Sequence, residues 1–328
     1  MMRAVLCTKW GDPADLTVGE APEPSPGPGQ VLIEVEAAGV NFADTLLIAG
    51  KYQEKPPLPF VPGAEAAGPV LEVGERVTRF RPGDRVLAML AGGGFAERVA
   101  ADESDVMALP EAMDFTTAAG FPIAYGTAHG ALVWRAGLAA GEVLLVHGAA
   151  GGVGLATVEV GKALGASVIA CAGGPDKLAV AEAHGADMLI DSGEADLRGR
   201  VKALTDGRGA DVIVDPVGGE VFDASLRCIA WGGRIVVVGF AGGRIPQIPA
   251  NILLVKNVSA VGFYWGSYRR RDPARIKAQF EQLFGWYRAG RLKPHVSHVL
   301  PLERVADAMD LLLGRKSTGK VVLATGTG

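Results

Sequence analysis

The chain of 328 residues has few cysteines, little net charge and no long apolar stretch. Its three cysteines, Cys7, Cys171 and Cys228, are odd in number and far apart, which excludes a disulfide framework and a cysteine-pair metal site and indicates a reducing compartment. No apolar run approaches the ~18 residues of a membrane span, and the N-terminus lacks the apolar core of a signal peptide. We therefore expect a cytoplasmic protein that has no membrane partner.

The charge pattern excludes a second class of partner. The 32 basic and 36 acidic residues give a formal net charge of −4, and the one basic cluster, Arg269 to Arg271, is short. A nucleic-acid partner is therefore not expected. Hydrophobic residues make up 49% of the chain and charged residues 21%, which is typical of a well-packed globular protein, and the length favours two domains.

The first 122 residues are rich in turns and in patterns typical of strands. Short strands are expected at 31–40, 69–73, 84–89 and 95–100, and the proline-glycine run at 22–29 excludes helix and central strand there. This part of the chain predicts a small barrel-like domain.

From residue 143 apolar strands alternate with helices. The strands are expected at 143–146, 167–171, 188–191, 211–215, 234–240 and 257–263, with helices from about 152, near 176–184, around 196–205 and over 220–230. This alternation predicts a parallel sheet covered on both faces. Two further helices at 273–290 and 302–314 and a strand at 320–324 follow. We therefore divide the chain into residues 1–122, 123–263 and a return to the first domain over 264–328.

A glycine-rich turn follows the strand at 143–146. The stretch from Ala149 to Gly154 fits the dinucleotide-binding pattern G-x-G-x-x-G with alanine at the first glycine. Gly151 lets the backbone approach a pyrophosphate, Gly154 lets the next helix pack on the sheet, and the helix N-terminus supplies N–H groups. The alternative is a tight turn that binds no ligand. The predicted cofactor-binding residues here are Ala150, Gly151, Gly152, Val153 and Gly154.

The end of the second strand distinguishes the two nicotinamide cofactors. NAD sites place an acid there to accept from the ribose 2′-hydroxyl, but this strand ends in alanine and glycine and Lys177 follows shortly. A cation beside an acid-free turn suits a 2′-phosphate, so NADPH is favoured over NADH. The alternative is that Lys177 is a solvated helix residue and Asp176 binds the ribose.

Two later strand ends add candidate ligand contacts. Val238, Gly239 and Phe240 end a parallel strand, where ligands of such sheets bind, so their backbone is expected beside the nicotinamide carboxamide. Tyr264 and Trp265 follow the next strand and are candidates to line a pocket for a planar acceptor. Alternatively, these two aromatic residues are core or dimer contacts.

The whole chain resembles the zinc-free quinone oxidoreductase (zeta-crystallin-like) branch of the medium-chain dehydrogenase/reductase superfamily. The resemblance implies an α/β fold with a GroES-like β-barrel-type catalytic domain and a Rossmann domain with a doubly wound parallel sheet. The motifs that carry it are AAGVNFADTLLIAGKY (37–52), PFVPGAEAAGPVLEVG (59–74), FRPGDRV (80–86), GGFAE (93–97), VHGAAGGVG (146–154), DPVGG (215–219) and STGKVVL (317–323).

The resemblance also implies that no metal takes part. Zinc-dependent alcohol dehydrogenases typically carry a cysteine where this chain has Asn41, and Gly-His-Glu where it has Gly63, Ala64 and Glu65. The chain also lacks the four closely spaced cysteines of a structural zinc site, so a zinc site of the usual nitrogen and sulfur type is not expected. Without a Lewis acid, activated acceptors such as quinones and electron-poor enones are the expected substrates.

By resemblance, five further residues belong to the site. Asn41, with Asp44 one helical turn on, is expected to bind the cofactor or the acceptor carbonyl, and Tyr52 stands where related enoyl-thioester reductases carry a tyrosine proton donor. Thr127 is expected beside the nicotinamide ring and Arg315 near the adenosine phosphate. The alternatives are that Tyr52 is a wall residue and that Arg315 only satisfies the dipole of a helix C-terminus.

Two other functions remain open from the sequence. One is an NADPH-dependent 2-enoyl thioester (enoyl-CoA) reductase, which Tyr52 favours. The other is an NADPH-binding protein without turnover, since the branch includes lens crystallins. We also expect a homodimer, because the strand near Val258–Gly262 lies at the sheet edge in this fold and an unpaired apolar edge favours pairing across a two-fold axis.

Overall fold

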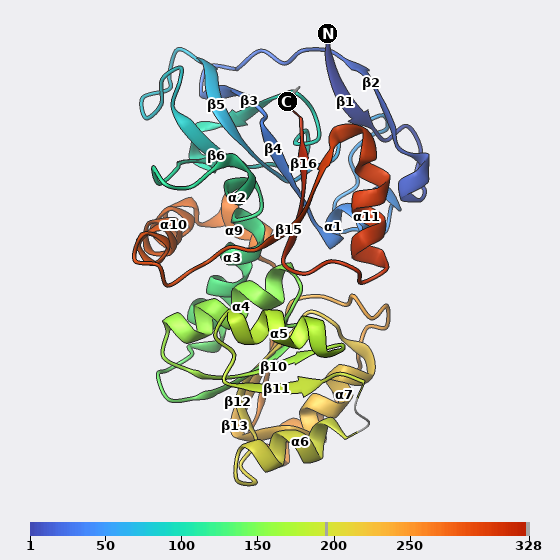
Figure 1. The fold of residues 1–328 in the computed structure, drawn as a ribbon, viewed down its shortest axis with the longest axis vertical. Coiled ribbons are helices and arrows are strands. Elements are labelled where there is room, and N and C mark those ends of the chain that lie inside the picture. The colour runs from blue at the N-terminus through green and yellow to red at the C-terminus, as the bar shows by residue number, and fades with distance from the viewer. Residues whose placement is uncertain (194–195, 326–328) are drawn as a thin grey trace. The chain divides into compact units, whose positions relative to one another are not determined.

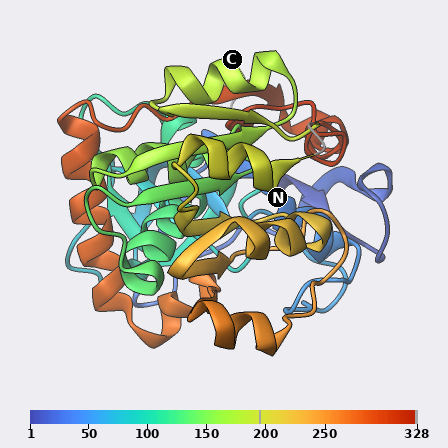
Figure 2. The same ribbon diagram turned by 90° about the horizontal axis from the view of Figure 1, so that it is seen from below.

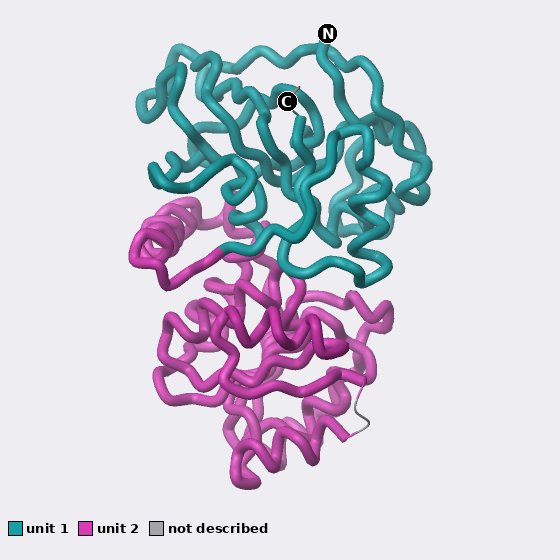
Figure 3. Tube along the Cα trace, viewed as in Figure 1, with its two compact units in different colours: residues 1–123, 294–328 teal, residues 124–293 magenta. Residues whose placement is uncertain are grey.

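The computed structural model describes residues 1–193 and 196–325. The chain forms two compact units (Figure 3). Unit 1 contains residues 1–123 and the C-terminal segment from residue 294, and unit 2 contains residues 124–293. None of the helices in the described part of the chain is long and apolar enough to cross a membrane.

Unit 1 is built on a curved sheet that contains segments from both ends of the chain. Eight strands form this sheet, in the order β15-β16-β4-β5-β3-β7, with β6 paired to β5 and β8 paired to β6. The strands β1 and β2 form a separate pair. The strands are β1 (Met2–Leu6), β2 (Thr17–Ala21), β3 (Gln30–Glu34), β4 (Ala37–Val40), β5 (Glu65–Val73), β6 (Arg85–Met89), β7 (Arg98–Asp102), β8 (Val106–Ala108), β15 (Val296–Pro301) and β16 (Lys320–Ala324). The helices are η1 (Pro13–Asp15), α1 (Phe42–Ile48), η2 (Glu103–Asp105), α2 (Phe115–Ala119), η5 (Leu302–Arg304) and α11 (Val305–Leu313).

The single strand expected at 31–40 is two strands. Residues 31–33 of β3 pair with residues 70–73 of β5, and β4 pairs with residues 66–67 of the same strand. Between them the chain bends at Val35 and Glu36, whose N–H groups bond to Glu97 and Ala67 instead of continuing one ladder. The apolar alternation runs through the bend because both strands face one core.

Unit 2 is a doubly wound parallel sheet, as the sequence predicts. Its strand order is β11-β10-β9-β12-β13-β14, and helices cover both faces (Figures 1 and 2). The strands are β9 (Val143–His147), β10 (Ser167–Ala172), β11 (Met188–Asp191), β12 (Ala210–Asp215), β13 (Ile229–Val237) and β14 (Ser259–Gly262). The helices are α3 (Pro122–His129, which begins at the junction of the units), a π-helical segment η3 (Gly130–Ala136), α4 (Gly152–Ala163), α5 (Pro175–Ala183), α6 (Leu197–Leu204), α7 (Gly219–Cys228), α8 (Ala250–Lys256), η4 (Trp265–Ser267), α9 (Tyr268–Arg271) and α10 (Pro273–Arg288).

Residues 264–293 lie in unit 2, whereas the sequence pattern assigned them to the return segment. This segment belongs to unit 2 because aromatic side chains at its start pack against η3, and hydrophobic periodicity does not predict such contacts. The rings of Phe263 and Tyr268 pack against Trp134 of η3, at centroid separations of 6.3 and 5.0 Å. Residues before and after the sheet therefore close one side of this unit together.

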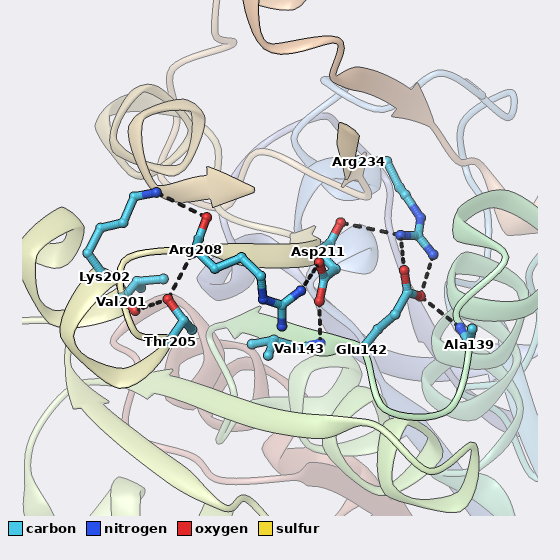
Figure 4. A network of polar contacts seen from close by, with 10 residues as sticks. Ala139, Glu142, Val143, Val201, Lys202, Thr205, Arg208, Asp211 and Arg234 are labelled. Carbon is cyan, nitrogen blue, oxygen red and sulfur yellow. Dashed lines mark hydrogen bonds and ion pairs between the residues drawn. The ribbon is translucent and has the colours of Figure 1, made fainter. Parts of the chain in front are cut away.

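A polar network holds the amino ends of three neighbouring strands (Figure 4). Arg234 of β13 makes two parallel hydrogen bonds to Glu142, which precedes β9, both of 2.6 Å. Asp211 of β12 accepts a 2.7 Å hydrogen bond from the N–H of Val143 and pairs with Arg208. These ion pairs and hydrogen bonds stabilise the amino ends of the strands. Ligands of such sheets bind at the opposite, carboxyl ends of the strands.

Candidate functional site

The predicted glycine turn joins β9 to α4. The N–H of Ala149 bonds to Cys171 at the end of β10, which anchors the turn to the neighbouring strand. A Cβ on Gly154 would clash with the carbonyl oxygen of Gly148, so only glycine permits this close contact between helix and turn. Gly151 has extended backbone geometry before the first residue of α4, and the first N–H groups of a helix have no intrahelical partners. The residues present therefore fit a pyrophosphate.

A second turn lies at the carboxyl end of β12, the strand next to β9 in the sheet. One carboxylate oxygen of Asp215 accepts from the N–H groups of Val217 and Gly218, at 2.8 and 2.9 Å, and its other oxygen is buried without a hydrogen-bond partner in the described residues. The predicted segment Val238–Phe240 begins with an N–H bond from Val238 to the Asp215 carbonyl. The structure thus places this segment and the glycine turn at the carboxyl ends of β13 and β9, the two strands that flank β12.

His147 is the last residue of β9 and directly precedes the glycine turn. Its Nε2 lies 2.7 Å from the hydroxyl of Ser225 in α7, and burial lowers the pKa of this imidazole against the opposing charge of Asp215. Burial therefore favours the neutral form of this ring. Sequence analysis missed Asp215 and Ser225, although the position of Asp215 at a strand end, directly before Pro-Val-Gly-Gly, was a usable signal.

The tip of β10 is free of acids, as the sequence indicates. Gly174 has a positive φ of 81°, and Lys177 lies half-buried in the first turn of α5. The nearby Asp191 accepts hydrogen bonds from the N–H groups of Gly174 and Gly193, which lower the pKa of this carboxyl. Asp191 is therefore engaged with backbone donors, whereas Asp176, in the first turn of α5, is exposed.

Trp265 is a core side chain of unit 2, which is the alternative that the sequence left open. Its indole lies against Gly126, where an added Cβ would overlap the ring, and its Nε1 donates a 2.9 Å hydrogen bond to Gln279. Gln279 in turn donates to the carbonyl of Gly126 at 2.8 Å. These contacts fix the helix that carries Thr127, which is buried, whereas Tyr264 is 39% exposed.

Two of the predicted residues of unit 1, Asn41 and Asp44, lie at the start of α1. Asn41 precedes the first helical residue, and Asp44 accepts a 2.8 Å hydrogen bond from the Asn41 N–H. Burial raises the pKa of Asp44 from 3.8 to about 7, although the Asn41 N–H and the charge of Lys320 act in the opposite direction. Tyr52 lies half-buried in the loop that follows this helix.

Sequence analysis did not identify the two charged side chains that contact Asn41. Lys320, the first residue of β16, places its Nζ 2.6 Å from Asn41 Oδ1 and 2.7 Å from Glu65 Oε1. Glu65 begins β5 and accepts a 2.8 Å hydrogen bond from Asn41 Nδ2. Both residues lie in motifs that carry the family resemblance, but nothing in the sequence shows that the three meet.

Arg315 occupies a strained backbone position at the C-terminus of α11. Its φ is 53°, and its N–H and that of Lys316 bond to carbonyls of the last helical turn. This left-handed position after a helix is usually glycine, and a larger side chain costs on the order of 1 kcal/mol there. Such strain is consistent with a ligand-binding role of the side chain.

The described residues contain no group of three or more His, Cys, Asp or Glu side chains that could hold a metal ion. At Asn41 and Glu65 the nearest polar group is the ammonium of Lys320, so a metal ion there would compete with a fixed positive charge. The donor set of unit 1 therefore suits hydrogen bonding to a ligand.

Asp44 makes the stability of the fold depend on pH. Its pKa is higher in the folded protein than in the unfolded chain, so its contribution to stability is fully present below about pH 4 and is lost as the pH rises to about 7. We expect the stability advantage of Asp44→Asn over the parent to grow by on the order of 1 kcal/mol per pH unit in this window and to be constant above it. Urea unfolding at several pH values measures this difference, and equal differences at pH 5 and pH 8 would contradict it.

Two family models match the chain. The alcohol dehydrogenase GroES-like domain matches residues 27–111, and the zinc-binding dehydrogenase family matches residues 152–284. Quinone oxidoreductase-like protein 2 homolog of Nematostella vectensis is 46% identical over 326 residues, which are 98% of this chain and 89% of that protein.

Solved structures show the same relationship. Quinone oxidoreductase of Pseudomonas syringae is 32% identical with a TM-score of 0.92, over 99% of this chain and 100% of that one. Escherichia coli quinone oxidoreductase complexed with NADPH is 29% identical with a TM-score of 0.92, over 98% of this chain and 100% of that one. The predicted pairing of a GroES-like domain with a Rossmann domain is confirmed, and the chain belongs to the quinone oxidoreductase branch of the medium-chain dehydrogenase/reductase superfamily.

Proposed function

We propose that the protein uses NADPH to reduce quinones or other electron-poor enones by hydride transfer, without zinc. The observation that carries this proposal is the glycine turn between β9 and α4 beside an acid-free strand tip with Lys177 in the next helical turn. The likeness to the Escherichia coli enzyme complexed with NADPH supports the same cofactor.

Each part of NADPH would be bound by a different set of residues. The N–H groups of Gly152, Val153 and Gly154 in the first turn of α4 would hold the pyrophosphate, which the backbone of Gly151 would approach. Lys177 and Arg315 would face the 2′-phosphate. The backbone at Val238–Phe240 would meet the carboxamide, and Thr127 would lie beside the nicotinamide. Bound NADPH supplies a hydride, so the protein contributes orientation and exclusion of water.

The acceptor would be held by the side chains of unit 1. Asn41 would donate a hydrogen bond to the acceptor carbonyl, whose oxygen gains the electron pair when a hydride arrives at the conjugated carbon. An enolate or carbanion then needs one proton, and Tyr52 is the proposed donor. A hydroquinone anion takes its proton from water.

We also propose that the protein is a homodimer paired through β14. This strand lies at the edge of the sheet, and the nearby side chains of Trp231, Leu254 and Val255 are 76%, 78% and 71% exposed. An apolar edge of this kind favours pairing with a second copy. Light scattering at micromolar concentration should give twice the mass of the 33.9 kDa chain, and a monodisperse monomer would contradict the proposal.

A substrate panel tests the activity and separates its alternatives. NADPH oxidation should be fast with p-benzoquinone or an electron-poor enone, and crotonyl-CoA as the preferred substrate would indicate an enoyl thioester reductase. Tyr52→Phe should lower kcat for enone or enoyl substrates by ~10²-fold and leave quinone reduction almost unchanged, because only the former need a positioned acid. Equal losses would assign Tyr52 to positioning. Tight NADPH binding without turnover on any acceptor would indicate a binding protein.

Lys177→Ala tests the cofactor assignment. A lysine facing a phosphate makes a charge-assisted hydrogen bond worth ~1.5–3 kcal/mol, so the Kd for NADPH should rise roughly tenfold to a hundredfold while that for NADH barely changes. The effect should decrease as salt is added. Lys277→Ala, which removes an exposed lysine from α10, is the matched control and should leave both Kd values unchanged. An equal loss for both cofactors would direct attention to Asp176.

A further inference from the structure

Three polar side chains from distant segments meet inside unit 1. Asn41 follows β4, Glu65 begins β5 and Lys320 begins β16, and these three strands are neighbours in the sheet. All three side chains are buried, with exposed fractions of 9%, 0% and 6%. The site described above uses Asn41 but leaves the role of the charged pair open.

The chemistry of the partners determines which way the Asn41 carboxamide points. An ammonium has donors only, so the Asn41 atom 2.6 Å from Lys320 Nζ must be the carbonyl oxygen. A carboxylate has acceptors only, so the atom 2.8 Å from Glu65 Oε1 must be the amide nitrogen. The opposite orientation would set donor against donor and acceptor against acceptor, so the amide cannot flip.

The charged pair is itself fully bonded. Lys320 Nζ donates to Val40 O at 3.0 Å as well as to Asn41 and Glu65, which uses its three protons. The second carboxylate oxygen of Glu65 accepts from the Ile123 N–H at 2.9 Å. Because every donor and acceptor has a partner, neither residue needs a ligand to complete its hydrogen bonds.

Of the N–H donors in this cluster, one on Asn41 is only weakly bonded. Its oxygen is occupied by the ammonium, and one of its two amide protons is bonded to Glu65. The second proton has only a long contact of 3.4 Å with Gly39 O, far from the ideal of about 2.9 Å. This N–H of Asn41 can therefore exchange its weak hydrogen bond for a stronger one to a ligand.

We propose that Lys320, together with Glu65, is a positioning residue that fixes Asn41 as a hydrogen-bond donor to a ligand oxygen. This inference rests on the proposed function, because it takes Asn41 to contact the acceptor or the cofactor. The oxygen is either the acceptor carbonyl or a ribose hydroxyl. A donor of fixed orientation stabilises negative charge that develops on a carbonyl oxygen without having to reorient during the reaction.

The first experiment neutralises the pair without changing its volume greatly. Lys320→Met with Glu65→Gln removes both charges together, because removing one alone would leave a buried unpaired charge and destabilise the fold. We expect the double variant to fold and kcat/KM with p-benzoquinone to fall about tenfold, the value of one oriented hydrogen bond. Parental kinetics in the folded double variant would overturn the inference.

The second experiment asks whether the pair acts through Asn41. Asn41→Ala should lose about tenfold in the parent and less than twofold in the Lys320→Met, Glu65→Gln background, since that background has already lost the oriented donor. Losses that multiply would show that the pair is only structural, and would overturn the inference.

Asn41→Asp combined with Glu65→Gln tests donor polarity, and it decides the matter if the Lys320 double variant does not fold. The second change is needed because Asn41→Asp alone would set a carboxylate oxygen 2.8 Å from the Glu65 carboxylate, whereas the combination keeps one carboxylate beside Lys320. Residue 41 then has no side-chain N–H for a ligand, so kcat/KM should fall as far as in Asn41→Ala. Parental activity in this variant would show that the ligand needs no donor at this position, and would overturn the inference.

Titration of NADPH into each variant identifies the ligand oxygen. A rise in Kd assigns it to the ribose, and an unchanged Kd with lower kcat/KM assigns it to the acceptor. A parent protein that oxidises no NADPH with any acceptor would overturn the proposed function, and the Kd values alone would then decide the inference, with an unchanged Kd in Asn41→Ala counting against it.

A matched pair of charges in unit 2 provides the control. Glu142→Gln with Arg234→Met removes an ion pair at the amino ends of the parallel strands, on side chains that are 25% and 18% exposed. This variant should lose stability but keep the parental KM and Kd. Kinetic losses like those of the Lys320 variant would show that any ion-pair loss has this effect, and would overturn the inference.

Discussion

The antiparallel pairing of β16 with β4 is the constraint on which unit 1 depends. The chain leaves this unit at residue 123 and returns at residue 294, so without the pairing the C-terminal segment would have no place in the sheet. The same ladder brings Lys320 to Asn41, which is 279 positions away in the sequence. One strand pairing therefore completes both the sheet and the polar cluster at the start of α1.

The parallel sheet of unit 2 separates stability from binding along the length of its strands. At the amino ends, Arg234, Glu142 and Asp211 form ion pairs and hydrogen bonds that hold three strands in register. At the carboxyl ends the chain instead passes through glycine-rich turns, such as those that lead from β9 into α4 and from β12 into α7. Parallel strands make this division possible, because all of their carboxyl ends meet at one edge.

The two units use charge in different ways. In unit 2 a half-buried cation, Lys177, lies in the first turn of α5, next to a strand tip whose own residues carry no acid. In unit 1 the charge of Lys320 is neutralised by Glu65 at 2.7 Å, and both side chains bond to the Asn41 amide and fix its orientation. Asp44, with a pKa raised by burial, shows that this region does not readily hold a further charge.

The sequence by itself determined the features that depend on short stretches of chain. The alternation of strands and helices from residue 143 predicted the parallel sheet. The sequence also showed the glycine turn at Ala149–Gly154 and the acid-free tip of β10, because each of these features lies within a few consecutive residues. The overall motif pattern also indicated the family, which the relatives confirm. Local spacing carries this information because it follows from backbone geometry.

Tertiary structure alone decided the features that depend on contacts between distant segments. The bend that splits residues 31–40 into two strands, the packing of Trp265 in the core and the place of residues 264–293 in unit 2 all follow from partners far along the chain. The orientation of the Asn41 amide is the clearest case. Glu65 and Lys320 set this orientation through their hydrogen bonds to Asn41. The residues next to Asn41 in the sequence do not predict these two contacts.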